Sequence, residues 1–208
     1  MTTMKTTNEK TRRGRPLSFN RESALNTALQ LFWKQGYEGT SIADLVNAMG
    51  IAPPSLYTAF GSKEQLYLEV VDLYLQGPGN FIQHALAQTS DARSFTQQVL
   101  SNAANEFTAH DHPPGCIVSS GLLTSATLHH KMAQSLSDLR TATLGLIRQR
   151  FEQAQDCGEL PASTNCHSLA RFFGAVIQGM SIQARDGADA TELHAMASQA
   201  MASWPERL

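Results

Sequence analysis

The side chains best suited to metal or thiol chemistry stand in one short stretch of the sequence. They are His110, Asp111, His112 and Cys116, all residue types that ligate metals. Their spacing matches no zinc motif, and the prolines at 113 and 114 predict a surface loop. Metal sensing, redox sensing through the Cys116 thiol and a loop without any ligand all stay open. We expect neither a resident metal nor a cofactor.

Catalytic residue types occur in the sequence, but not in the arrangements that catalysis uses. The chain has no G-x-S-x-G elbow for a serine nucleophile and no G-x-x-x-x-G-K-[ST] loop for phosphates. It also lacks a G-x-G-x-x-G turn for a dinucleotide and an H-E-x-x-H helix for zinc. We therefore expect that the protein is not an enzyme.

The composition is that of a globular protein, with 42% hydrophobic and 16% charged residues in 208. No apolar run is long enough to span a bilayer, and no apolar stretch follows the polar N-terminal residues. The three cysteines at 116, 157 and 166 form no C-x-x-C pair, which favours reduced thiols. The composition therefore predicts a cytoplasmic protein with no membrane partner.

Charge is distributed unevenly along the chain. The net charge is −2, yet residues 1–21 carry six basic residues against Glu9, a net +5, so the remainder sums to −7. Such a basic arm is typical of phosphate contact, although a disordered tail that aids solubility fits the charge equally well. We expect residues 1–17 to form a disordered basic arm.

The elements that would use this arm follow it directly. Apolar residues at spacings of three, four and seven predict a helix over 41–49, and a second helix is expected over 53–60, because proline is tolerated in a first helical turn. Gly50 and Ile51 join them with the length and turn chemistry of a helix-turn-helix. An earlier helix is expected to end at Gly36, and a later one to run from Ser62 to about Gly77.

In a helix-turn-helix, the second helix is held at an angle that lets it enter the major groove of DNA. Thr40 and Ser41 precede the first helix, where hydroxyls and N–H groups can meet a phosphate. Lys63 adds a positive charge at the start of the next helix. Double-stranded DNA is therefore the expected partner.

The rest of the chain keeps a helical period, with breaks near 113–115, 157–158 and 186–187, and shows no alternating strand pattern. The sequence thus predicts an all-α protein. The last two helices have wide apolar faces and small residues, which favours burial against a second copy over a purely internal core. The expected dimer contacts are Phe172, Val176, Met180, Met196, Ala200 and Trp204.

Three segments of the N-terminal region resemble the TetR family of repressors. They are GYEGTSIADL at 36–45, MGI at 49–51 and LYTAFGSKEQL at 56–66. The resemblance covers roughly residues 18–75. It implies an all-helical homodimer, with a three-helix DNA-binding domain and a larger helical domain. It also implies binding to a palindromic operator and release when a small molecule enters the larger domain.

The resemblance also implies which residues contact DNA. Positions that match Thr40, Ser55, Tyr57 and Lys63 commonly meet DNA, with Tyr57 and Lys63 on phosphates. This chain departs from the family at Pro53 and Pro54, because proline has no N–H to donate. Specificity is then expected to fall on other residues of the helix and on the arm, whose arginines can enter a minor groove. The full set of expected DNA contacts is Arg15, Thr40, Ser41, Pro54, Ser55, Tyr57, Thr58 and Lys63.

The expected organisation is an arm over 1–17, a helix-turn-helix domain over 18–64 and an effector-binding and dimerisation domain over 65–208. An effector would move the helix that joins the two domains. Apolar residues that would line its pocket are Tyr74, Phe81, Phe107, Cys116, Phe173 and Met180. A metal- or redox-responsive regulator acting through Cys116 and nearby histidines is the alternative, and activation instead of repression stays open.

Overall fold

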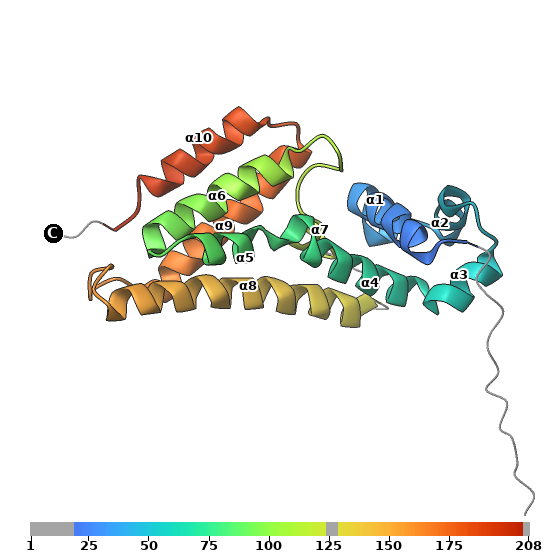
Figure 1. Ribbon diagram of the computed structural model, residues 1–208, viewed down its shortest axis with the longest axis horizontal. Helices are drawn as coiled ribbons and strands as arrows, with labels where there is room; N and C mark the ends of the chain where they lie inside the picture. The colour runs from blue at the N-terminus through green and yellow to red at the C-terminus, as the bar shows by residue number, and fades with distance from the viewer. Residues whose placement is uncertain (1–18, 124–128, 206–208) are drawn as a thin grey trace, which may run out of the picture.

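The computed structural model describes residues 19–123 and 129–205, and within these residues the only regular structure is helical (Figure 1). The predicted all-α fold is therefore confirmed. The N-terminal helices are α1 Arg21–Gly39, α2 Ile42–Met49, α3 Pro53–Phe60 and α4 Lys63–Gln76, followed by the short 3-10 helix η1 Pro78–Asn80. The larger domain contains α5 Phe81–Gln88, α6 Ala92–Phe107, α7 Ile117–Ser120, α8 His130–Asp156, α9 Cys166–Arg185 and α10 Ala190–Met201.

Local sequence signals explain most ends of the N-terminal helices. The Asn20 side chain accepts a hydrogen bond from the Ser23 N–H at 3.0 Å and so caps α1. Gly50 ends α2 with φ of 65°, a left-handed conformation that glycine adopts without steric cost. The prediction that Gly36 closes the first helix was wrong in detail. Gly36 is non-helical at φ of 75°, but α1 resumes after this kink and runs to Gly39.

Helix α4 joins the two parts of the molecule. Its N-terminus carries Lys63 beside α3, and its buried face packs along α1 (Figure 1). The chain leaves α4 at Gln76, next to the end predicted at about Gly77, and turns through η1. Buried side chains of both parts belong to one contiguous core. A movement of α4 is therefore felt by α1 and by the larger domain together.

In the larger domain α8 is the longest helix, and it packs against α9, while α10 packs against α6 and α9 (Figure 1). A side chain on Gly174 of α9 would require the end of the Leu144 side chain on α8 to move aside. None of the described helices combines the length and apolar character needed to cross a bilayer.

Three residues expected at a dimer interface are buried inside the single chain. Met180 has no exposed surface, Ala200 is 7% exposed and Trp204 is 9% exposed. Trp204 packs its ring against Phe151 at 5.5 Å and Phe173 at 5.8 Å. The sequence pattern showed that these residues are apolar, but not which neighbour covers them, and here the chain's own helices do so. This corrects their assignment to a surface that meets a second copy.

Candidate nucleic-acid interface and effector cavity

Helix α3 presents its outer face to solvent next to the tight turn after α2. Leu56 and Phe60 are buried against the core, which fixes the rotation of α3 about its axis. Tyr57 and Thr58 then point outward, and 48% of Tyr57 is exposed. An aromatic residue exposed on a short helix that is anchored on its opposite face suits contact with a groove or a phosphate backbone.

The start of α3 has almost no free hydrogen-bond donors. Pro53 and Pro54 lie in its first turn and have no N–H. The next two amides, of Ser55 and Leu56, donate to Ala52 O at 2.9 and 3.3 Å. Thr58 donates its hydroxyl to Pro54 O at 2.7 Å. The N-terminus of α3 therefore presents exposed side chains, but not the cluster of free amides with which helix N-termini usually bind anions.

The side chains of the two polar residues before α2, Thr40 and Ser41, already form hydrogen bonds within the chain. Ser41 and Asp44 form a reciprocal capping box, with the Asp44 N–H donating to Ser41 Oγ at 3.1 Å and the Ser41 N–H to Asp44 Oδ2 at 2.9 Å. Hydrogen bonds from Ser41 hold the pKa of Asp44 below its usual value. Thr40 is fully buried and donates its hydroxyl to Gly36 O at 2.8 Å. The expectation that the Thr40 side chain meets a phosphate is therefore corrected, because its hydroxyl is buried and donates to the carbonyl of Gly36 at the kink in α1.

Lys63 is also held by its surroundings. Its ammonium lies 4.1 Å from the ring centroid of Tyr37, a cation–π contact. Tyr37 in turn donates its hydroxyl to Glu64 Oε1 at 3.0 Å. Burial lowers the pKa of Lys63, while the carboxylates of Glu38, Glu64 and Asp44 favour its charged form. Lys63 is positioned at the edge of the α3 surface, in an environment that already contains negative charge.

The folded helix-turn-helix carries little positive charge of its own. Residues 19–66 contain three basic and four acidic residues, a net charge of −1. Arg21 adds little free positive charge to this domain, because it donates to both carboxylate oxygens of Glu69 at 2.7 and 2.8 Å. The basic residues of the arm, including Arg15, lie outside the described residues. Five of the six cations expected near DNA in residues 1–21 belong to that segment.

A small cavity of about 60 Å³ is enclosed by residues of α4, η1, α5, α7, α8 and α9. Three of the six residues expected to line an effector pocket, Tyr74, Phe81 and Cys116, line this cavity. The other three, Phe107, Phe173 and Met180, are buried in the core and do not line it. Their apolar periodicity predicted burial correctly, but periodicity does not distinguish core packing from a cavity wall.

Sequence reasoning missed Arg140, which also lines this cavity. Its Nη1 donates to Val118 O at 2.9 Å and to Gly121 O at 3.2 Å. A signal for it was present in α8, where Leu136 and Ile147 are buried and Arg140 stands on the same face between them. A charged residue within a buried stripe is a stronger indication of function than an aromatic one.

The loop that contained the candidate metal ligands serves instead to join the domains. His112 stacks on Trp33 of α1 with ring centroids 4.2 Å apart, and its Nε2 lies 2.9 Å from Glu106 Oε1. Trp33 donates its Nε1–H to Gly115 O at 3.1 Å, and Arg185 donates to Trp33 O at 3.1 Å. Within the part of the chain that the structure describes, no three histidine, cysteine, aspartate or glutamate side chains gather as a metal site.

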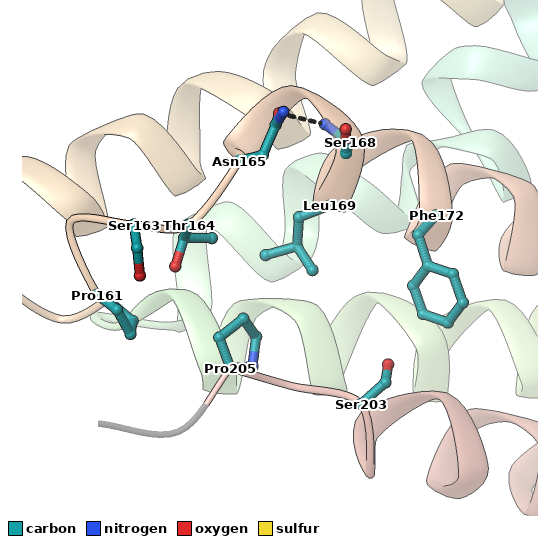
Figure 2. Close-up of a pocket in the computed structure, with 9 residues that line it drawn as sticks. All are labelled: Pro161, Ser163, Thr164, Asn165, Ser168, Leu169, Phe172, Ser203 and Pro205. Atoms are coloured by element: carbon teal, nitrogen blue, oxygen red, sulfur yellow. Dashed lines mark hydrogen bonds between the residues drawn. The ribbon is translucent and has the colours of Figure 1, made fainter. Parts of the chain in front are cut away.

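A larger hollow of about 600 Å³ lies at the opposite end of the molecule from α2 and α3, between the loop before α9 and the end of α10 (Figures 1 and 2). Figure 2 shows Leu169 and Phe172 along one side of it, with Pro205 and Ser203 opposite. Asn165 caps α9 through the Ser168 N–H at 2.9 Å. This hollow has no charged lining residue among those described, and none of its lining residues belongs to α4.

Comparisons with known proteins agree with this geometry. Residues 24–70 match the model of bacterial regulatory proteins of the tetR family, and residues 93–201 match the tetracyclin repressor-like C-terminal domain. The HTH-type transcriptional repressor ComR of Escherichia coli (strain K12) is 35% identical over 93% of both chains. The HTH-type transcriptional repressor BdcR from the same organism is 29% identical over 90% of both chains.

Solved structures give the same result. The cysteine mutant of the TetR family regulator CifR, complexed with 26bp operator DNA, has a TM-score of 0.88 and 37% identity. The match covers 92% of this chain and all of that one. A TetR regulator from Rhodococcus sp. RHA1 is 39% identical with a TM-score of 0.61, covering 89% of this chain and all of that one. The chain belongs to the TetR family of DNA-binding transcriptional regulators.

Proposed function

We propose that this protein is a homodimeric repressor that binds a palindromic operator through α3 and releases it when a small effector enters the cavity beside α4. The observation that carries the proposal is the exposed face of α3, with Tyr57 and Thr58 outward and Leu56 and Phe60 anchored. The helix has the position of a recognition helix after a tight glycine turn. Its role is binding, with no catalytic step.

The basic arm would supply most of the long-range attraction to DNA. Because residues 19–66 carry a net charge of −1, the folded domain alone does not favour a polyanion. The preceding residues 1–18 carry five basic residues against one acidic residue. Arg15 is the basic residue among them that is nearest to α1 in the sequence, and it would contact a phosphate or a minor groove flanking the α3 site.

Dimerisation would use the outer face of α9. Phe172 is 42% exposed and Ile182 is 46% exposed, and Val176 lies on the same side of the helix. The small residues Ala175 and Gly179 stand between them, which would let a second helix approach closely. Met196 of α10 is half-buried and would contribute at the edge of this face. This set replaces Met180, Ala200 and Trp204, whose surfaces are covered within the chain.

Two connections would carry the effector signal to α3. The first is α4, which lines the cavity at Tyr74 and carries Lys63 at its other end. The second is the loop before Cys116, held to α1 through Trp33 and Gly115. Tyr74 also contacts Trp33 directly, with ring centroids 4.8 Å apart. A preference of the effector for the DNA-incompetent arrangement by on the order of 1 to 3 kcal/mol would suffice for regulation.

The test is selection of bound sites from random duplex DNA by the full-length protein, combined with its mass in solution and the salt dependence of binding. We expect a two-fold palindrome with half-sites about one helical turn apart, a dimeric mass and a steep salt slope. Recovery of no motif at low salt would contradict the proposed function. A Gln83→Ala variant, changed at an exposed residue of α5, serves as the control that should select the same palindrome.

A further inference from the structure

The effector cavity holds polar groups that the protein leaves poorly satisfied. Tyr74 has no exposed surface and lines the cavity, and its hydroxyl has no hydrogen-bond partner of good geometry among the described residues. The Cys116 thiol lies near it, but sulfur is only a weak hydrogen-bond partner. The Tyr67 hydroxyl, two helical turns earlier on the same face of α4, is also buried and has no hydrogen-bond partner among the described residues. Because a buried hydroxyl without a partner destabilises a protein, a ligand that completes the bond would account for Tyr74.

Arg140 gives the cavity a positive charge that no lining residue neutralises. The described residues around the cavity include no aspartate or glutamate, and Arg140 forms no salt bridge within the described part of the chain. Its Nη1 donates hydrogen bonds to the backbone carbonyls of Val118 and Gly121, which hold the guanidinium in place. Burial lowers its pKa, yet an arginine stays protonated in proteins. Within the part of the chain that the structure describes, the guanidinium therefore lacks a compensating anion.

The rest of the cavity limits the size and shape of that anion. At about 60 Å³ it has room for only a few non-hydrogen atoms. Its other walls are mainly apolar and include Leu75, Phe81, Ile82, Val118, Leu144 and Ile177. A phosphate group carries more charge than one cation balances, and a nucleotide is far too large. A short-chain carboxylate matches the one cation among the described lining residues, the hydroxyl donor and the mainly apolar walls.

We propose that the effector is a small aliphatic carboxylate whose oxygens accept hydrogen bonds from the Arg140 guanidinium and the Tyr74 hydroxyl while its short chain packs on the apolar wall. This inference rests on the proposed function, because it names the ligand class of the same site. A carboxylate at this position bridges α8 to α4. It also contacts Tyr74, whose ring packs on Trp33, so binding is transmitted to α1.

The experiment uses propionate as the probe and propionamide as its neutral counterpart of equal size, at matched ionic strength. Two readouts are measured for the full-length protein: the shift of Tm and the release of the selected operator in fluorescence anisotropy. Propionate is expected to raise Tm and release the operator, and propionamide to do neither. Equal effects of both compounds, or an effect of neither while operator binding persists, would overturn the carboxylate inference.

Variants separate recognition from folding. Tyr74→Phe removes only the unpartnered hydroxyl, so the free protein should be at least as stable, while propionate affinity falls on the order of ten-fold. Arg140→Lys retains a cation but not the planar fork, and should weaken propionate at least as much. Arg148→Lys on the same helix, where Arg148 is exposed and paired with Glu152, is the matched control and should leave affinity unchanged.

The outcomes of these variants distinguish the two proposals. If Tyr74→Phe binds propionate as tightly as the original chain, the assignment of Tyr74 as a ligand is wrong. If all variants and the original chain bind the operator but ignore every carboxylate, the cavity inference fails and the repressor proposal stands. If no operator is bound by any of them, the proposed function itself fails.

Discussion

The α3 surface proposed to bind DNA and the cavity proposed to bind the effector differ in how far their polar side chains are paired within the chain. At the surface, Ser41 bonds to Asp44, Thr58 to Pro54 O, and Lys63 lies on Tyr37. In the cavity, the described residues give the Tyr74 hydroxyl no good partner and Arg140 no counter-ion. Surface polar groups can exchange hydrogen bonds with water, so their intramolecular hydrogen bonds change the stability of the fold only slightly. The two proposals therefore predict that DNA affinity depends on long-range charge and shape, and that effector recognition depends on a few short-range bonds.

The largest effect is expected from neutralising the arm, which tests the first half of that comparison. Changing Lys5, Lys10, Arg12, Arg13 and Arg15 to alanine should weaken operator binding about 100- to 1,000-fold at moderate salt. The slope of log affinity against log salt should become shallower by about one for each phosphate that the arm no longer neutralises. Fluorescence anisotropy across a salt series measures both. An unchanged slope would show that the folded domain supplies the charge contacts by itself.

The next largest effect concerns Gly115, in the loop that holds the two regions together. Its φ is 79°, and a Cβ there would lie 2.6 Å from Ser181 O and 2.8 Å from Arg185 Cγ. Gly115→Ala should therefore lower the free energy of unfolding by about 2 to 4 kcal/mol. Gly158→Ala is the matched control, because its φ is 78° but the added Cβ would meet open space. It should cost about 1 kcal/mol in urea unfolding.

Equal costs for the two glycine variants would mean that the loop yields easily, and that its contact with α1 does not transmit a signal. A larger cost for Gly115→Ala supports a stiff connection between Cys116 and Trp33.

A smaller effect is expected from Tyr57, which sharpens the distinction between surface and cavity. Tyr57→Ala should weaken operator binding about ten-fold, which corresponds to the removal of one good interaction with DNA. Because 48% of Tyr57 is exposed, Tm and dimer mass should hardly change. Anisotropy, thermal unfolding and light scattering measure the three properties. Loss of the dimer in this variant would show that α3 belongs to the subunit interface instead.

The smallest effect is a pH dependence from the capping box of α2. The Ser41 hydroxyl holds the pKa of Asp44 below its usual value of 3.8, so the carboxylate stabilises the folded state at neutral pH. This contribution is present above pH 3.8 and is lost as pH falls through the lower folded value. Asp44→Asn should therefore differ slightly from the original chain at pH 7 and match it in strong acid. A difference that persists unchanged into acid would rule out the carboxylate as its source.

Most of the N-terminal domain was predictable from sequence because its signals are local. Helix α3 spans Pro53–Phe60 as the sequence predicted, and α2 differs only at its first residue. Prolines, glycine turns and capping serines act within one or two turns of the chain, so their effect does not depend on distant residues. The exposure of Tyr57 follows from the same periodicity, once Leu56 and Phe60 are assigned to the buried side.

By itself, therefore, the sequence determined the helical class, the helix-turn-helix and the charge asymmetry between arm and body. Only the tertiary structure decided that Thr40 and Trp204 are buried, that His112 stacks on Trp33, and that Arg140 lines a cavity with Tyr74. Helix formation depends on neighbours a few residues apart, whereas burial and hydrogen-bond partnership depend on packing between helices far apart in the chain. A periodic pattern identifies the apolar face of a helix, but only packing determines what covers that face.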